Sequence, residues 1–361
     1  MRELNTVKKF AETAPELHKM FSDYANQYRT EMGVKGLTFD TSMSKAEKEE
    51  AINKCFAEVL SQKSKVTADE FNNVVEFANS SVVREFADSI MNSLIDMILP
   101  EALIPSLGMI AEFKFGGYND SFSFKVKNNA LYTVSAAGQR QRTAPAQILR
   151  DTTLTLTPYN HMVTVEVNLP DVLSGRTMLA PEIMKSAVSV EAQIRNEALD
   201  AFTTVMAGAN VPSGLKVQNY TEKSLITLCQ KVTAWNQGRK AVIVGTPVAL
   251  KSVLPSEVAT RILLSDGYVT AGYLPVFNTY DVIALDQVAD YTSTTYGLKL
   301  DDTKLYVISP ASDKIVKVAV GETFQHTDAV YDNANLSQSA TINKAWATAV
   351  ITNSVCGIVN L

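Results

Sequence analysis

The first hundred residues place apolar side chains three and four positions apart, which is the spacing of amphipathic helices. The predicted apolar faces of these helices contain Leu17, Phe21, Tyr24, Phe56, Val59, Phe71 and Val75. Ser44 with Glu47, and Thr67 with Glu70, have the spacing of capping boxes, in which each side chain satisfies a backbone donor of the other residue. Proline lacks this donor and disrupts a helix interior, so we expect Pro100 and Pro105 to end the helical run.

From Phe113 the pattern changes to alternation with period two, which predicts strands. Three segments show it: Phe122 to Lys127, Leu154 to Thr157 and Val163 to Val167. The intervening stretch from Asn128 to Arg150 is too long for a tight turn. The simplest interpretation is a two-stranded ribbon that extends away from the body. Such a ribbon is marginally stable alone in water, so we expect it to pack on another chain.

A second long helix is predicted from Pro181 to Ala207, about 40 Å in length at 1.5 Å per residue. Its core face contains Ile183, Ala187, Val190, Ile194, Ala198 and Val205. Residues 221–320 then alternate helices and strands, and a last strand, Ala345 to Ile351, should return to the sheet beside the long helix. The order of elements predicts a mixed fold of the α+β class.

The distribution of charged residues distinguishes the predicted ribbon from the rest of the chain. The chain has a net charge of −5, yet the stretch from Ser121 to Arg150 contains five basic residues and no acidic one. These are Lys125, Lys127, Arg140, Arg142 and Arg150. One interpretation is a solvated loop, and the one we favour is a tip that docks on an acidic patch of a neighbouring copy. Nucleic-acid binding ranks third, because the aromatic residues form no stacking platform and the whole chain is acidic.

Candidate chemistry is sparse. Cys55, Cys229 and Cys356 lie far apart, and we expect all three to be buried reduced thiols. The three histidines, His18, His161 and His326, belong to no metal or nucleophile motif. Gly245-Thr246-Pro247 follows a predicted strand but lacks the lysine and glycine spacing of a phosphate loop. We therefore predict no catalytic site, no metal and no cofactor.

The sequence also bears on localisation. The polar start, Met1 to Asn5, lacks the basic-then-apolar order of a secretory signal, and no run of about 18 apolar residues is present. We expect a protein that is made and used in a cytoplasm and has no membrane partner.

The order of parts resembles the Hong Kong 97-type major capsid proteins of tailed bacteriophages. The resemblance covers roughly residues 105–361. It is carried by the strand Val163 to Val167, the segment Asp171 to Ser174, the helix Pro181 to Ala207, and the stretches Lys240 to Leu254 and Gly272 to Phe277. It is a match of architecture more than of a diagnostic motif.

The resemblance implies a division of the chain. Residues 1–109 would form an N-terminal helical arm, 110–170 an extended β-loop, 171–220 with 321–361 a peripheral domain that contains the spine helix 181–207, and 221–320 an apical domain. Residues 1–99 offer few loops long enough to fold them back into a bundle, so we expect the arm to lie along a neighbouring copy.

The resemblance also implies a function: a non-enzymatic subunit that assembles with other copies of itself, as hexamers and pentamers, into an icosahedral head. The implied partners are a portal, scaffolding, decoration or head-completion proteins, and packaged double-stranded DNA that is enclosed without sequence-specific binding. The protein would be assembled in the bacterial cytoplasm and end in the virion. Two alternatives stay open. One is the shell of an encapsulin-like nanocompartment, and the other is a cytoplasmic α/β enzyme that uses residues 221–320.

Overall fold

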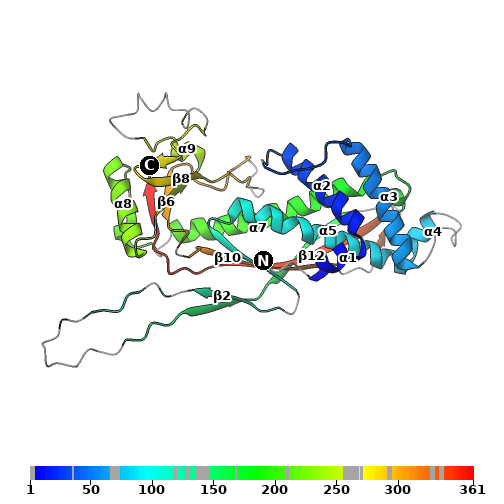
Figure 1. The fold of residues 1–361 in the computed structure, drawn as a ribbon, viewed down its shortest axis with the longest axis horizontal. Helices are drawn as coiled ribbons and strands as arrows, with labels where there is room; N and C mark the ends of the chain where they lie inside the picture. Colours follow the sequence, from blue (N-terminus) through cyan, green and yellow to red (C-terminus); the bar gives the residue numbers. More distant parts are fainter. Residues whose placement is uncertain are drawn as a thin grey trace.

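A long helix that lies on a sheet forms the centre of the molecule, with further helices packed at one end and a second sheet at the other (Figure 1). In this computed structural model, the structure describes residues 5–34, 36–65, 74–117, 120–126, 128, 130–134, 136, 147–166, 169–207, 211–254, 268, 271–290, 295–311, 313–325, 330–332 and 337–361. The mixed helix and strand content agrees with the predicted α+β class.

Among the described residues, five helices precede the first strand. They are α1 (Asn5–Thr13), α2 (Pro15–Glu31), α3 (Lys45–Ser64), α4 (Val74–Asn79) and α5 (Ser81–Leu107). The capping box of Ser44 and Glu47 at the start of α3 is confirmed. The box predicted at Thr67 and Glu70 lies outside the described residues.

The expectation that these helices have too few loops to fold back is wrong for the described part of the segment, and their contact with a neighbouring copy stays a prediction. The buried side chains of α2, α3 and α5 share one core with those of the long helix α7 (Leu179–Ala207), as Phe21, Phe56 and Ile98 illustrate. Asn53 ties α3 to the start of α7, since its Nδ2 donates to Thr177 O at 3.0 Å and its Oδ1 accepts from Leu179 N at 2.9 Å. Helix α2 ends at Glu31 and α3 begins at Lys45, and both pack into the shared core, so the helices form a lobe on their own chain.

The prediction that Pro100 and Pro105 end the helical run is also wrong, because both lie inside α5. Each proline costs a helix interior about 3 kcal/mol. The surrounding residues Ile95, Ile98, Leu99, Leu103 and Leu107 are all buried in the main core. Burial of five such side chains contributes roughly 1.5–3 kcal/mol each, enough to offset two missing backbone hydrogen bonds.

The first sheet underlies α5 and α7. Its strands are β1 (Ala111–Gly116), β10 (Val316–Gln325), β12 (Ser337–Val350), β11 (Val330–Asp332) and β4 (Tyr159–Glu166), in the order β1-β10-β12-β11 with β4 also paired to β12. Alternate residues of β10 point to opposite faces: Val316, Val318 and Val320 join the main core under the helices. Ala319 points to the other face and packs against Phe122 and Phe124.

A buried ion pair fastens α5 to this sheet. The register of β10 against β12 shifts between Val320 and Thr323, and Thr323 is the first paired residue after this irregularity. Asp96 of α5 accepts from that N–H at 3.1 and 3.0 Å and pairs with Lys344 Nζ at 2.5 Å. The Thr323 hydroxyl also donates to Asp96. Helix α5 therefore contacts the sheet directly beside its irregularity, through one buried carboxylate.

The second sheet forms the body at the other end of α7 and has the strand order β5-β13-β9-β6-β8-β7. Its strands are β5 (Lys216–Val217), β13 (Gly357–Asn360), β9 (Lys304–Ile308), β6 (Val242–Gly245), β8 (Tyr280–Ala284) and β7 (Val276–Phe277). It is accompanied by α8 (Glu222–Trp235), α9 (Pro247–Leu250) and the short helix η2 (Ser213–Leu215). A further short helix, α6 (Leu169–Leu173), precedes α7.

The strands of the two sheets depart from three expected boundaries. The predicted last strand is present as part of β12, but the chain then crosses to the second sheet and ends in β13, so residues 357–360 do not belong with the first sheet. The boundary expected between residues 320 and 321 falls inside β10. The expected β-loop of 110–170 likewise includes β1, which pairs in the first sheet.

Candidate interaction surface

The predicted ribbon is present and leaves the body below the first sheet (Figure 1). Its base is the antiparallel pair of β2 (Phe122–Val126) and β3 (Thr152–Leu156), with Phe122 opposite Leu156. Phe122 and Phe124 are buried against Ala319 of β10. The ammonium of Lys114 in β1 lies 4.8 Å from the centre of the Phe124 ring, a cation–π contact. The ribbon is therefore anchored to the face of the sheet opposite the long helix.

Beyond this base, side chains connect the two arms. Asn128 N–H donates to Asp151 Oδ1 at 3.0 Å. Farther out, Gln147 bridges both backbone groups of Thr133: its Oε1 accepts from Thr133 N at 2.8 Å and its Nε2 donates to Thr133 O at 2.9 Å. These contacts keep the described arms together past the end of the β2–β3 ladder.

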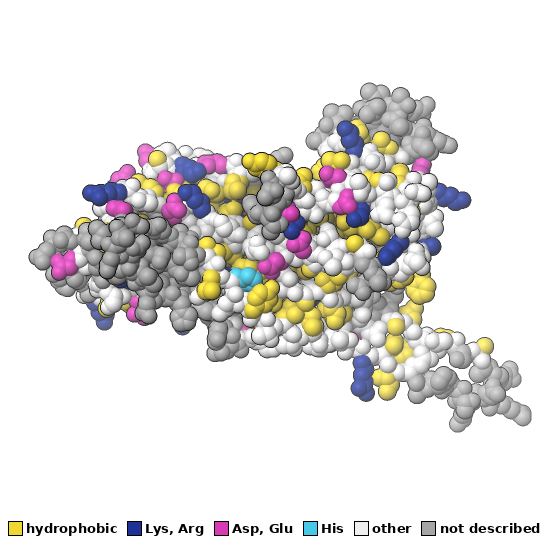
Figure 2. Space-filling model, turned by 180° about the vertical axis from the view of Figure 1, so that it is seen from behind, with side chains coloured by type: hydrophobic (Ala, Val, Ile, Leu, Met, Phe, Trp, Pro, Cys, Tyr) yellow, Lys and Arg dark blue, Asp and Glu magenta, His cyan; other side chains and the backbone are white. Residues whose placement is uncertain are grey.

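The outer part of the ribbon exposes large apolar side chains to solvent (Figure 2). Leu131, Tyr132, Val134 and Ile148 are 75%, 59%, 93% and 73% exposed, respectively. Full burial of such a side chain is worth about 1.5–3 kcal/mol. These residues were not among the contact residues predicted from the sequence, because charge alone was considered in this segment. The signal was available in the apolar triplet of Leu131, Tyr132 and Val134 within a segment expected to project from the body.

The structure describes two of the five basic residues predicted for contact. Lys125 pairs with Asp151 at 3.4 Å, and Arg150 is exposed. Lys127, Arg140 and Arg142 lie outside the described residues. The contact role of all five stays a prediction.

The apolar faces predicted for the helices can be compared with observed burial. On α7, Ile183, Ala187, Val190, Ile194 and Ala198 are buried, whereas Val205 is half-buried. The face is wider than expected and also includes Met184, Leu199, Phe202 and Met206. In the N-terminal lobe, Leu17, Phe21, Tyr24 and Phe56 are buried and Val59 is half-buried. Phe71 and the Val75 side chain lie outside the described part.

The cysteines differ in burial. Cys229 is buried, but Cys55 and Cys356 are only partly buried, which corrects the expectation that all three are core residues. Burial raises the pKa of the Cys229 thiol to about 12 and that of Cys356 to about 11. Both thiols are therefore protonated at neutral pH and weak nucleophiles.

His161 forms a packed cluster with two residues of the body. Its ring stacks on Trp346 with centroids 3.4 Å apart, and its Nε2 lies 3.5 Å from Glu197 Oε1. The other carboxylate oxygen of Glu197 accepts from Trp346 Nε1 at 2.8 Å. Burial lowers the pKa of His161, and the Glu197 charge opposes this shift. These contacts join α7, β4 and β12.

The remaining candidates for chemistry have structural explanations. Thr246 caps α9, since its Oγ1 accepts from Ala249 N at 3.3 Å, and it donates to Asp302 at 2.6 Å. Within the described ranges, no group of three histidine, cysteine or acidic side chains is arranged to hold a metal ion. No helix in the described part of the chain is long and apolar enough to cross a membrane.

Comparisons with known proteins give similarity in structure alone. No protein-family model matches the sequence, and no curated protein matches it significantly. A capsid protein of the cyanophage P-SCSP1u superposes with a TM-score of 0.47 at 8% identity, over 70% of this chain and 86% of that one. A phage-related protein from Bordetella bronchiseptica gives 0.46 at 12% identity, over 76% and 96%. The virus-like particle of Pyrococcus furiosus gives 0.40 at 9% identity, over 73% and 96%.

Proposed function

We propose that this chain is the major capsid protein of a tailed bacteriophage, the repeated subunit of a closed icosahedral shell around double-stranded DNA. The observation that carries the proposal is the ribbon. It is anchored firmly at its base, extends from the body, and exposes four large apolar side chains. A solitary globular protein gains nothing from this arrangement, because the apolar surface is covered only when another molecule packs on it.

The asymmetry of the ribbon favours repeated assembly over a simple dimer. A protruding element on one side of a subunit fits a different surface on its neighbour, and such heterologous contacts propagate into rings when the rotation closes. Many weak contacts of this kind give a stable shell because each subunit touches several neighbours. The proposed assemblies are hexamers and pentamers of this chain.

The parts of the subunit have proposed roles in that shell. The body around α8 and the second sheet would be the apical domain, and α7 with the first sheet would be the peripheral domain. The five basic residues of the ribbon would contact neighbouring copies. A portal and scaffolding, decoration or head-completion proteins would complete the head, which forms in the bacterial cytoplasm. Because the chain has a net charge of −5, it would enclose the DNA without sequence-specific binding. The role is structural and not enzymatic.

Negative-stain electron microscopy of the purified protein tests the proposal. Uniform polygonal shells or capsomers are expected, and a monodisperse monomer at high concentration would contradict it. A matched variant in which a short turn replaces residues 128–150 should stay folded and fail to assemble. Particles isolated from the native host distinguish a phage head, which protects double-stranded DNA from nuclease, from an encapsulin-like shell, which contains a cargo protein.

A further inference from the structure

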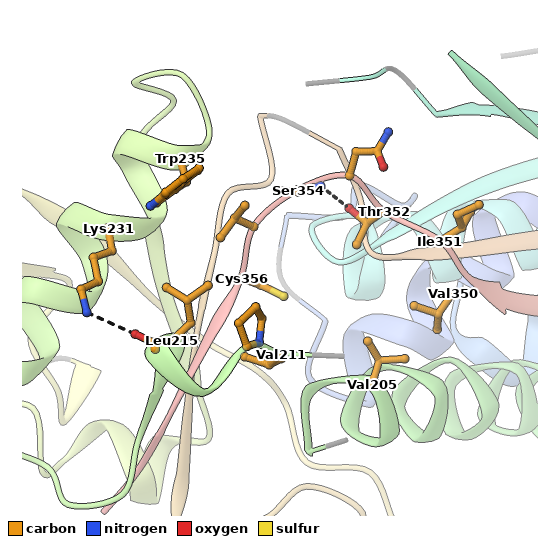
Figure 3. A pocket seen from close by; sticks show the side chains of 14 residues that line it. Val205, Val211, Leu215, Lys231, Trp235, Val350, Ile351, Thr352, Ser354 and Cys356 are labelled. Carbon is orange, nitrogen blue, oxygen red and sulfur yellow. Dashed lines mark hydrogen bonds between the residues drawn. The ribbon is translucent and has the colours of Figure 1, made fainter. Parts of the chain in front are cut away.

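A groove lies where the two sheets meet, between the end of α7, helix α8 and the crossing segment 350–356 (Figure 3). Its volume is about 840 Å³. The apolar part of its lining contains Val205, Val211, Leu215, Trp235, Val350, Ile351, Val355 and Cys356. A volume of this size holds a drug-sized apolar group, and therefore also several apolar side chains.

The indole of Trp235 stands at this groove and is 72% exposed. Large aromatic side chains at such positions are the residues that most often dominate protein–protein binding. The chain's other tryptophan, Trp346, is 2% exposed and belongs to the buried cluster with His161. Trp235 is thus a large apolar side chain left in water beside an apolar cavity.

The wall of the groove is held in place by a buried amide. Asn236 at the end of α8 is fully buried, donates from Nδ2 to Val355 O at 2.8 Å, and accepts at Oδ1 from Val355 N at 2.9 Å. The Ser354 hydroxyl donates to the same Oδ1 at 3.3 Å. The crossing segment is therefore fixed against α8, so a partner would find the groove already formed.

We propose that this groove receives the apolar part of the ribbon, Leu131 to Val134 with Ile148, from a second copy of the chain. The inference rests on the proposed function, because it names the surface on which the ribbon docks. The two surfaces match in chemistry: one is an apolar cavity beside an exposed indole, and the other is a projecting set of apolar side chains. The chain's own ribbon does not fill its groove, since these side chains are 59–93% exposed in the single subunit.

Charge plays a small part in this contact. Lys231 is the charged residue of the groove lining, and its Nζ donates to Gly214 O at 3.2 Å. The lining offers the basic ribbon no carboxylate partner. Burial of apolar surface therefore provides the attraction, and the contact differs from the acidic patch expected for the basic residues of the ribbon. It should persist at high salt, where ion pairs between exposed residues are screened.

Fluorescence of the two tryptophans reports on this contact. Assembly should shift the emission of Trp235 to shorter wavelength and reduce its quenching by acrylamide several-fold, whereas the buried Trp346 stays unchanged. The variant Trp235→Phe supplies the Trp346 baseline. Equal quenching of Trp235 in subunits and in intact shells overturns the proposal.

A cysteine pair supplies an independent test. Val134→Cys places a thiol on the ribbon, and Asn353→Cys places an exposed partner in the groove lining; the native Cys356 is unsuitable because burial raises its pKa. With diamide as the two-electron oxidant, assembled shells of the double variant should give disulfide-linked oligomers that the control with Val134→Cys alone does not form. Ile148→Cys serves if the first variant fails to assemble. Shells without this link overturn the groove contact and leave the capsid proposal intact, whereas a wild-type chain that forms no shells overturns the capsid proposal itself.

Discussion

Removing the charge of Asp96 should strongly destabilise the subunit. Asp96 and Lys344 are 1% and 2% exposed, and their charged atoms lie 2.5 Å apart. At that separation and an effective dielectric constant of about 20, their attraction is roughly 7 kcal/mol. Taking both ions out of water costs several kcal/mol each, so the intact pair contributes little net stability. In Asp96→Asn, however, the Lys344 ammonium stays buried without its counter-charge, and we expect a loss of about 3–5 kcal/mol.

Urea unfolding of the unassembled subunit measures this loss. Circular dichroism and tryptophan fluorescence should be followed together, because coincident transitions are needed before a free energy is assigned. The matched variants are Lys344→Met and the double variant Asp96→Asn with Lys344→Met, in which neither charge remains. The double variant should be more stable than the sum of the single effects predicts, since removing both charges removes the unpaired ion. An Asp96→Asn subunit within about 1 kcal/mol of the wild type would show that Lys344 is not left as an unpaired buried ion, because such ions cost more than that.

Three further predictions concern the ribbon and the body. Phe124→Ala removes a fully buried ring from the base of the ribbon and should weaken the packing of the ribbon on the sheet by about 3–5 kcal/mol. Faster proteolysis between residues 128 and 150 would show this loss, and an unchanged rate of cleavage would contradict the anchoring role of Phe124. Burial lowers the pKa of His161 in the folded protein, so the unfolded chain binds the proton more readily than the folded chain does. The free energy of unfolding should therefore fall as the pH drops below the usual histidine pKa of about 6.5, and level off below the pKa of the folded state. Melting temperatures of the wild type and His161→Asn between pH 7 and 5 check this, with a smaller loss expected in the variant. Replacing Arg140 and Arg142 with glutamate should lower the shell yield while the subunit stays folded; a wild-type yield across a range of salt concentrations would exclude a role in assembly.

Local features of the sequence predicted local structure well. The capping box of Ser44 and Glu47, the span of α7 and the pairing of β2 with β3 follow from interactions between residues close in the chain or from a strong period. The core face of α7 was identified for the same reason, because the 3.6-residue period determines which side chains share a side of the helix. Val205 is the exception, since its burial depends on the groove at the end of the helix.

Tertiary packing decided what these patterns left open. Helix α5 continues through Pro100 and Pro105 because its apolar side chains are buried against α7 and the sheet, which outweighs the local preference to stop. The N-terminal helices return to their own chain because Asn53 and the shared core bind them there. No periodicity in the sequence encodes either partner.

Patterns along the sequence were enough to predict a helical start, a basic two-stranded ribbon and a long amphipathic helix. Which surfaces remain uncovered, in contrast, depends on tertiary contacts. The apolar side chains of Leu131 and Val134 look the same in a sequence whether they are buried or exposed, and the groove beside Trp235 is built from segments that are far apart in the chain. Exposure depends on contacts between distant residues, and those contacts form only when the whole chain has folded.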